Sequence, residues 1–277
     1  MKVDISLPPI GVLGLGHLGC ILGFKYSDVP GSWGTWHNKH PKKITFPTFQ
    51  FEWGKKLSWN QIPEKEVILV LTIPPLMKSI EEESKRLHKW CYWMQKYRPA
   101  LKRMIYISTT GVYPKKSGYW QENSKFKPDT KSGKLRILTE KILAEYFSLN
   151  IVRPGGIYGN GRGIDMRLKL GKPIPVSRTP VHRIHVIDLA QIVIYLSKNP
   201  KSASCLNVVD NEAKPSFEVA QWLVENHEDF SQKMLSTSNV LTPKKIDYPK
   251  RFISNQLLKK LGLTLKYPTF RDGMGIL

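Results

Sequence analysis

The hexapeptide GLGHLG at residues 14–19 stands between a short apolar run, Ile10 to Leu13, and a stretch of helical composition, Cys20 to Tyr26. Strand, glycine turn and helix in this order are typical of a site that binds a dinucleotide pyrophosphate. The first glycine permits the tight turn, the second lets backbone N–H groups approach the phosphates, and the third lets the helix pack closely on the strand. The alternative is a glycine-rich turn between two buried elements. We predict cofactor contacts from Gly14, Gly16, His17, Leu18 and Gly19.

Length and composition indicate a globular protein with a substantial core. The 277 residues are 41% apolar and 23% charged, enough for one large α/β domain with a smaller appendage. The three cysteines, Cys20, Cys91 and Cys205, are too few and too scattered for a disulfide framework or a metal site, so we expect a reducing compartment, the cytoplasm. No run approaches the roughly 20 apolar residues of a membrane span, so we expect no membrane association.

The formal net charge of +21 is large, but the basic residues are dispersed in ones and twos, such as Lys42-Lys43, Lys115-Lys116 and Lys244-Lys245. No basic helix, zinc-finger spacing or RNA-binding motif organises them, so the sequence does not favour a nucleic-acid partner. A positive field does favour small anionic ligands, such as NADPH or a nucleotide-linked substrate.

The second predicted strand, Gly31 to Trp36, bears on the choice of cofactor through the residues that follow it. An acidic residue there would bind the adenosine ribose of NAD, whereas positive charge would accommodate the 2′-phosphate of NADP. His37 and Lys39 occupy this position, so we predict that both contact the cofactor and that NADP is preferred to NAD. The alternative is that these are solvated loop charges.

Two further apolar runs predict parallel strands that are buried on both faces. Val67 to Ile73 ends at a pair of prolines, and we place Thr72 and Pro74 beside the cofactor. Met104 to Ile107 ends in a stretch with hydroxyl groups, among them Thr109 and Tyr113. Open α/β sheets bind ligands beyond the carboxyl ends of their strands, so these hydroxyls are candidates for substrate contact.

The rest of the chain continues the alternation of helices and strands less regularly. We predict helices at Glu81 to Tyr97, Leu135 to Leu149, Ile187 to Lys198, Phe217 to Asn226 with Ser216 as its cap, and Ser254 to Leu261 closed by Gly262. We predict strands at Asn150 to Val152, Arg183 to Val186 and Cys205 to Val209, with a turn from Arg153 to Gly159.

Four segments in this order resemble the extended short-chain dehydrogenase/reductase family, the NAD-dependent epimerase/dehydratase group. They are the glycine turn, Ser108 to Tyr113 (family form SSxxVYG), Arg153 to Gly159 (RPxxIYG) and Arg183 to Ala190 (RIHVDDLA). The resemblance implies an α/β fold, a Rossmann-type doubly wound parallel sheet with a small C-terminal substrate domain. Residues 1–159 would form the NAD(P)-binding domain and 160–277 mainly the substrate region, with 186–209 returning to the Rossmann core. The family also implies a homodimer.

The family's usual catalytic tyrosine and lysine, YxxxK with a Glu four residues later, are missing. Anchored on Glu140, the tyrosine position holds Ser132 and the lysine position holds Arg136. A serine hydroxyl titrates far too high to replace the tyrosine unaided, and a guanidinium stays protonated and cannot relay protons. Thr109 falls on the family's Ser/Thr position. Other candidates for the acid/base are Tyr113, Tyr119, Tyr158 and His185.

These assignments leave two functions open. The first is an NAD(P)-dependent oxidoreductase, epimerase or dehydratase that acts on a nucleotide sugar or similar anionic metabolite, with Thr109, Ser132, Arg136 and Tyr113 as the candidate catalytic residues. Arg153 and Pro154 would join the cofactor contacts, Tyr158, Arg183 and His185 would bind substrate, and no metal is expected. The second is a non-catalytic protein of the same fold that senses NADP(H).

Overall fold

The structure of the protein is a computed structural model that describes residues 7–41, 43–76, 79–174, 178–231 and 250–274. The chain divides into two compact units. Unit 1 comprises residues 1–114, 126–153 and 190–206, and unit 2 comprises residues 115–125, 154–189 and 207–277. Three lysines of the basic pairs named above lie outside the described residues: Lys42, Lys244 and Lys245.

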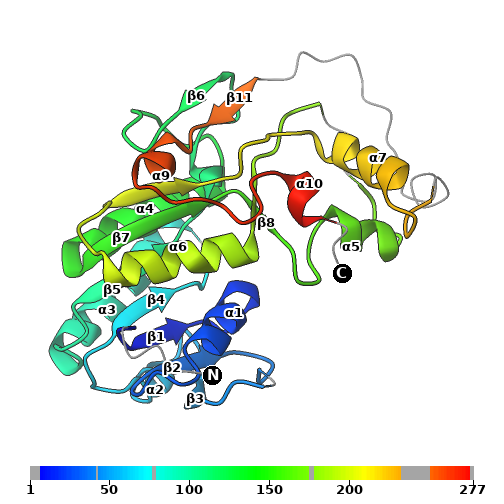
Figure 1. Ribbon diagram of the computed structural model, residues 1–277. Coiled ribbons are helices and arrows are strands. Elements are labelled where there is room, and N and C mark those ends of the chain that lie inside the picture. Colours follow the sequence, from blue (N-terminus) through cyan, green and yellow to red (C-terminus); the bar gives the residue numbers. More distant parts are fainter. Residues whose placement is uncertain (1–6, 42, 77–78, 175–177, 232–249, 275–277) are drawn as a thin grey trace. The chain divides into compact units, whose positions relative to one another are not determined.

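A parallel sheet forms the centre of unit 1 (Figure 1). In the described residues its strands are β1 (Ile10–Leu13), β2 (Trp33–Trp36), β3 (Thr48–Gln50), β4 (Ile68–Leu71), β5 (Arg103–Ile107), β7 (Ser148–Pro154) and β10 (Cys205–Val208). Their spatial order is β10-β7-β5-β4-β1-β2-β3, so the strand order reverses between β1 and β4. This is the order of a doubly wound Rossmann-type sheet, and the predicted fold class is confirmed.

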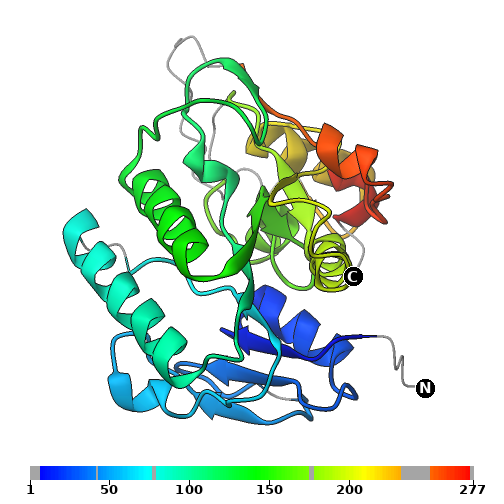
Figure 2. The same ribbon diagram turned by 90° about the vertical axis from the view of Figure 1, so that its left-hand side faces the viewer.

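Helices cover both faces of this sheet. The helices of unit 1 are α1 (His17–Lys25), α2 (Lys56–Trp59), α3 (Ile80–Tyr97) and α4 (Lys131–Tyr146), with the 3₁₀ turn η1 (Thr110–Val112) after β5; α6 (Val186–Lys198) contributes its C-terminal part. Helices α3 and α4 lie side by side on one face (Figure 2). On the other face Tyr26, the residue that follows α1, is joined to Ser197 of α6 by a 3.0 Å hydrogen bond between their hydroxyls.

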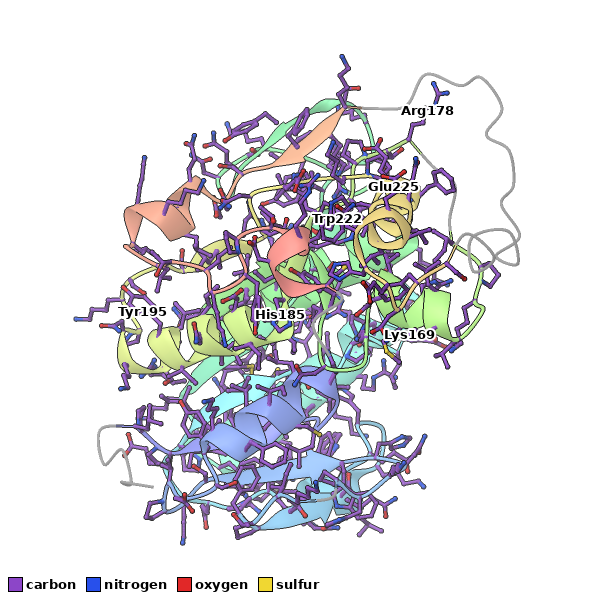
Figure 3. The ribbon with its side chains drawn as sticks, turned by 45° about the vertical axis from the view of Figure 1, so that its right-hand side comes forward. Lys169, Arg178, His185, Tyr195, Trp222 and Glu225 are labelled. Atoms are coloured by element: carbon purple, nitrogen blue, oxygen red, sulfur yellow. The ribbon has the colours of Figure 1, made fainter. Side chains whose placement is uncertain are left out.

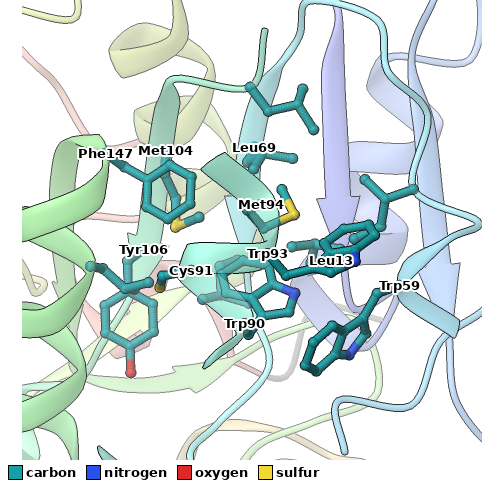
Figure 4. Close-up of a cluster of buried hydrophobic side chains, with 14 of the residues drawn as sticks. Leu13, Trp59, Leu69, Trp90, Cys91, Trp93, Met94, Met104, Tyr106 and Phe147 are labelled. Carbon is teal, nitrogen blue, oxygen red and sulfur yellow. The ribbon is translucent and has the colours of Figure 1, made fainter. Parts of the chain in front are cut away.

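Tryptophans dominate the core beneath α3 and α4 (Figure 4). Trp90 of α3 is fully buried and stacks on Trp53, with 4.9 Å between the ring centroids. Leu13, Leu69 and Met104 bring successive strands to the same cluster. Because each such side chain contributes about 1.5–3 kcal/mol on burial, this cluster fixes the strands whose ends carry the site described below.

Unit 2 is built from shorter elements around a smaller core. Its strands are β6 (Gly118–Trp120), β8 (Gly156–Tyr158), β9 (Arg183–His185) and β11 (Arg251–Ile253), and its helices are α5 (Ile164–Lys169), α7 (Ser216–Asn226), α9 (Gln256–Lys260) and α10 (Phe270–Gly273). Strand β6 pairs with β11 and β8 with β9, both in parallel. Trp222 of α7, seen in Figure 3, packs edge-on against Phe270 at 5.4 Å.

Three sequence-based predictions of local structure need correction. Helix α4 begins at Lys131 instead of Leu135, because the Thr130 side chain accepts a hydrogen bond from the Gly133 N–H and caps the helix there. The predicted turn from Arg153 to Gly159 contains strand β8. Ser216 is the first residue of α7 and not its cap, because its hydroxyl accepts a hydrogen bond from Arg183.

Candidate functional site

A cavity of about 720 Å³ lies in unit 1 at the carboxyl end of the sheet. Its walls are the residues that directly follow four strands: the glycine turn after β1, His37 after β2, Phe51 after β3 and Thr72 after β4. The cavity therefore opens where the strand order reverses, between β1 and β4. In open α/β sheets this crevice is where ligands bind, and the volume falls within the range of about 300–1,000 Å³ usual for ligand pockets.

The backbone of the glycine turn is held from two neighbouring strands. Thr35 of β2 accepts hydrogen bonds from the Gly14 N–H on its hydroxyl (2.9 Å) and from the Leu15 N–H on its carbonyl (2.6 Å). The Thr72 hydroxyl donates to the Gly14 carbonyl at 2.6 Å. Gly14 itself has φ +106°, a conformation that disfavours any residue with a Cβ.

The other two glycines of the turn, Gly19 and Gly16, have different steric surroundings. A Cβ on Gly19 would lie 2.2 Å from the Gly14 carbonyl oxygen, so α1 touches the turn at this point. A Cβ on Gly16 would meet nothing within 4 Å, and Gly16 is exposed. Gly16 also begins α1 without a side-chain cap, and the first turn of the helix has no acidic residue. The positive end of α1 is thus open toward an anion beside Gly16.

The structure places most of the predicted cofactor residues around this cavity. Gly14, Gly16, His37, Lys39, Thr72 and Pro74 line it. Its lining does not include His17, Leu18, Gly19, Arg153 or Pro154. Leu18 and Gly19 are buried, which suits the packing of α1 on the sheet. The role of each residue toward a cofactor stays a prediction.

Sequence reasoning missed the aromatic part of the lining. Trp36, Phe51 and Trp53 line the cavity together with Arg86 of α3. Phe51 and Trp53 follow β3, a strand of three residues that shows no hydrophobic periodicity in the sequence, so no signal marked them. Among the charged residues of the lining, Glu52 pairs with Lys55 at 2.7 Å and Arg86 pairs with Glu83.

The position of the missing dyad lies at the start of α4. Ser132 is exposed there, and Thr109 uses its hydroxyl to accept the Gly111 N–H at 3.0 Å. Arg136 points back toward β5, where its Nη1 donates to the Tyr106 hydroxyl and to the Ile107 carbonyl, both at 3.0 Å. The guanidinium therefore stabilises the end of β5.

A buried ion pair adjoins this region within unit 1. Arg153 donates from Nη2 to Glu140 Oε2 at 2.6 Å and from Nε to Oε1 at 3.1 Å, while Ser108 donates to the same Oε1 at 2.5 Å. Nη1 of Arg153 donates to the Tyr113 hydroxyl at 3.0 Å. Burial lowers the pKa of Arg153, but the hydrogen bonds and charge of Glu140 outweigh it, so the pKa is raised. Tyr113, predicted as catalytic, is thus a buried member of this network.

The predicted substrate residues all lie in unit 2. Tyr158 is buried and donates to the Thr269 carbonyl at 3.1 Å; burial, with the nearby charge of Asp210, raises its pKa. His185, labelled in Figure 3, is buried against Tyr158 and Tyr267, with ring centroids 5.1 and 3.9 Å away. Its Nδ1 accepts the Ile187 N–H at 3.2 Å, which anchors the start of α6.

A second cavity, of about 350 Å³, lies in unit 2 and has a positive lining. Tyr158 and Arg183 contribute to it, but His185 does not. Four of its lining side chains are cationic, and the described lining has no carboxylate; the cations are Arg162, Arg167, Lys172 and Arg183. Arg183 is buried, and its guanidinium donates hydrogen bonds to the carbonyls of Val181 and Lys214 and to the hydroxyl of Ser216.

Two negative findings apply to the described part of the chain. It contains no group of three or more His, Cys, Asp or Glu side chains that could hold a metal ion. No helix within it has both the length and the apolar character to cross a membrane.

Comparison with known proteins gives the fold a name. No family model and no curated protein matches the sequence. Solved structures do match over almost the whole chain. A Methylobacillus flagellatus structure named for the NAD-dependent epimerase/dehydratases is 23% identical, with TM-score 0.73 and coverage of 98% of this chain and 97% of the other. The chain has the fold of these proteins.

Two other matches with this fold have named activities. ADP-L-glycero-D-manno-heptose-6-epimerase from Helicobacter pylori is 15% identical, with TM-score 0.72 and coverage of 99% of this chain and 96% of the other. dTDP-glucose 4,6-dehydratase from Bacillus anthracis, solved in complex with NAD, is 14% identical, with TM-score 0.69 and coverage of 96% and 94%. The family resemblance predicted from the four sequence segments is confirmed at the level of the fold.

Proposed function

We propose that the protein belongs to the NAD-dependent epimerase/dehydratase group and binds NADP(H) in the unit 1 cavity. The observation that carries this proposal is the lining of that cavity by Gly14, Gly16, Thr72 and the ends of β1 to β4. The open N-terminus of α1 would take the pyrophosphate, with Gly16 leaving room for it. His37 and Lys39 would receive the 2′-phosphate of NADP. The cofactor would supply the hydride chemistry.

We propose further that the substrate is a nucleotide sugar or a similar anionic metabolite. The unit 2 cavity supports this, because its cationic lining favours a phosphate-bearing ligand. Arg162 and Lys172 are exposed and could reach such a group, while buried Arg183 fixes the wall. Support also comes from the named activities of the structures that share the fold.

Cofactor binding is tested by titrating the protein with NADPH and NADH at fixed salt while following nicotinamide fluorescence. NADPH should bind more tightly than NADH. Lys39→Gln should weaken NADPH binding by about tenfold and leave NADH unchanged, because one charge contact to a phosphate is worth about 1–2 kcal/mol. Lys96→Gln, an exposed change on α3 away from the cavity, is the control. Binding of neither cofactor by the unmodified protein would overturn the proposal.

A second candidate is a non-catalytic NADP(H) sensor, favoured by Arg136. The positions of the family's catalytic tyrosine and lysine hold Ser132, which is exposed, and Arg136, whose guanidinium is hydrogen-bonded to Tyr106 and Ile107. Incubation with NADP or NADPH and a panel of nucleotide sugars distinguishes the two candidates. Formation of a new sugar product or a change in nicotinamide absorbance supports the enzyme, whereas tight NADPH binding without any turnover supports the sensor.

A further inference from the structure

Two exposed aromatic rings stand side by side on the small β6–β11 sheet of unit 2. These strands lie side by side in Figure 1 and pair in parallel. Phe252 stands opposite Tyr119, and Ile253 stands opposite Trp120. Side chains alternate between the two faces of a strand, so Tyr119 and Phe252 share one face and Trp120 and Ile253 the other. The second face is buried, whereas Tyr119 is 51% exposed and Phe252 45% exposed.

Strand pairing also gathers basic residues that the sequence keeps more than 130 positions apart. The Gly118 N–H donates to the Lys250 carbonyl at 3.1 Å, and the Lys250 N–H donates to the Ser117 hydroxyl at 3.0 Å. The pair Lys115-Lys116 is thereby brought next to Lys250-Arg251. The three lysines are exposed.

Acidic residues hardly offset this charge. Residues 115–125 and 250–260 contain seven Lys or Arg and one acidic residue, Glu122. An oxygen of the Glu122 carboxylate accepts the backbone N–H of Asn207 at 2.8 Å, and the side chain is half-buried. By the same alternation of side chains, Lys250 shares the face of Phe252, whereas Arg251 shares that of Ile253. The Lys116 ammonium lies over the Trp120 ring, 5.9 Å from its centroid. Apart from Lys116 and Arg251, the cations closest in the chain to the ring pair are therefore Lys250 and Lys115.

We propose that this face binds single-stranded RNA. Adjacent exposed rings offer a surface on which successive unpaired bases stack, and flanking lysines contact the phosphates between them. One of the dispersed basic pairs of the sequence, Lys115-Lys116, lies next to Lys250-Arg251 in the fold. A second copy of the chain is a poorer occupant, because two such faces would bring like charges together. The proposal is independent of cofactor binding in unit 1.

The test is fluorescence anisotropy of a labelled 12-nucleotide oligo(U) at several salt concentrations. Tyr119→Ala and Phe252→Ala should each weaken binding by at least about fivefold, since stacking contributes about 1–3 kcal/mol per base. Lys115→Gln with Lys250→Gln should lower the slope of log K against log salt by about 0.7 for each lysine removed. Tyr92→Ala, which removes a 63% exposed ring from α3, is the matched control and should change nothing.

Ring-retaining variants separate stacking from folding. Tyr119→Trp and Phe252→Tyr should keep the affinity, and all variants should melt within a few degrees of the unmodified protein. The proposal would be overturned if Tyr92→Ala lost as much affinity for oligo(U) as Tyr119→Ala, or if duplex RNA competed as well as unlabelled oligo(U). Either result would show attraction by charge without a stacking site. A dimer in solution that Tyr119→Ala dissociates would also overturn it, because a second copy would then occupy the face.

Discussion

Arg153 and Glu140 form a two-point ion pair inside unit 1, with side chains 8% and 5% exposed. The resemblance to the dehydrogenase family placed Arg153 among the cofactor contacts, but its donors go to Glu140 and Tyr113. Glu140 in turn accepts the Ser108 hydroxyl at the end of β5. The pair therefore joins β7 to α4 and to the segment that carries Thr109.

Removing the charge of Glu140 should destabilise the protein strongly. Glu140→Gln leaves the Arg153 guanidinium buried without its counter-charge, and breaking such a pair costs about 3–5 kcal/mol. Urea unfolding followed by tryptophan fluorescence measures this loss. Glu81→Gln breaks the exposed pair with Lys85 and should cost less than about 1 kcal/mol. A loss below 1 kcal/mol for Glu140→Gln would mean that the buried pair contributes no more than a surface one.

Alanine substitutions of Gly19 and Gly16 should affect stability to different degrees, although both should weaken NADPH binding. Gly19→Ala forces a Cβ against the Gly14 carbonyl oxygen and should lower the free energy of unfolding by about 1–3 kcal/mol as well as weaken NADPH binding. Gly16→Ala meets open space, so it should cost less than about 1 kcal/mol yet still weaken NADPH binding if phosphates approach there. Thermal melts with and without NADPH measure both effects. Unchanged NADPH affinity in Gly16→Ala would count against a pyrophosphate at this turn.

The fold was predictable wherever the hydrophobic pattern of a single segment identifies it as a strand or a helix. The continuous apolar runs of β1, β4 and β5 and the stripe of α3 are buried against one another, so their patterns identify them. Strands β3, β6 and β11 have three residues each and exist because a distant segment pairs with them. Their sequences give no periodicity to detect, and the aromatic wall of the cavity and the ring pair on β6–β11 were missed with them.

The directions of the side chains in the candidate site could not be predicted from the sequence either. The predicted helix, Leu135 to Leu149, included Arg136 but not Ser132, which the structure also places on α4, and nothing in the sequence tells which way Arg136 points. Its direction follows from Tyr106, a buried strand residue whose hydroxyl needs a partner. The same holds for Ser216 of α7, since its hydroxyl accepts a hydrogen bond from Arg183 of β9, a strand more than 30 residues earlier in the chain.

Asp210 should make the protein less stable as the pH rises. It is only 2% exposed, so its carboxyl group is shielded from water. Burial raises its pKa from 3.8 to about 7, although Arg183 lowers it somewhat. Unfolded chains lose this proton near pH 4 and folded chains near pH 7, so the destabilisation begins near pH 4 and is complete above pH 7. Asp210→Asn should therefore add about 4 kcal/mol at pH 8 and little at pH 4.

The check is the difference in unfolding free energy between Asp210→Asn and the unmodified protein, measured at pH 4, 6 and 8. The difference must grow with pH, since only the unmodified protein carries the titrating group. Asp229→Asn, at an exposed position paired with Lys169, should show no such growth. A pH-independent difference for Asp210→Asn would indicate that the carboxyl titrates alike in both states.

His182 should destabilise the protein in the opposite direction, as the pH falls. Its Nε2 accepts the Ile253 N–H at 3.0 Å, so the contact to β11 requires the neutral ring. Burial, together with the charges of Arg251 and Arg183, lowers its pKa from 6.5 to about 4. Unfolded chains take up a proton below pH 6.5 and folded chains only below pH 4, so about 3 kcal/mol of stability is lost between these values.

His182→Gln removes this proton uptake, so the stability of this variant should change less than that of the unmodified protein over the same pH range. The exposed substitution His40→Gln should instead follow the unmodified protein. If His182→Gln and the unmodified protein lose stability in parallel between pH 6.5 and 4, the histidine does not couple β11 to pH.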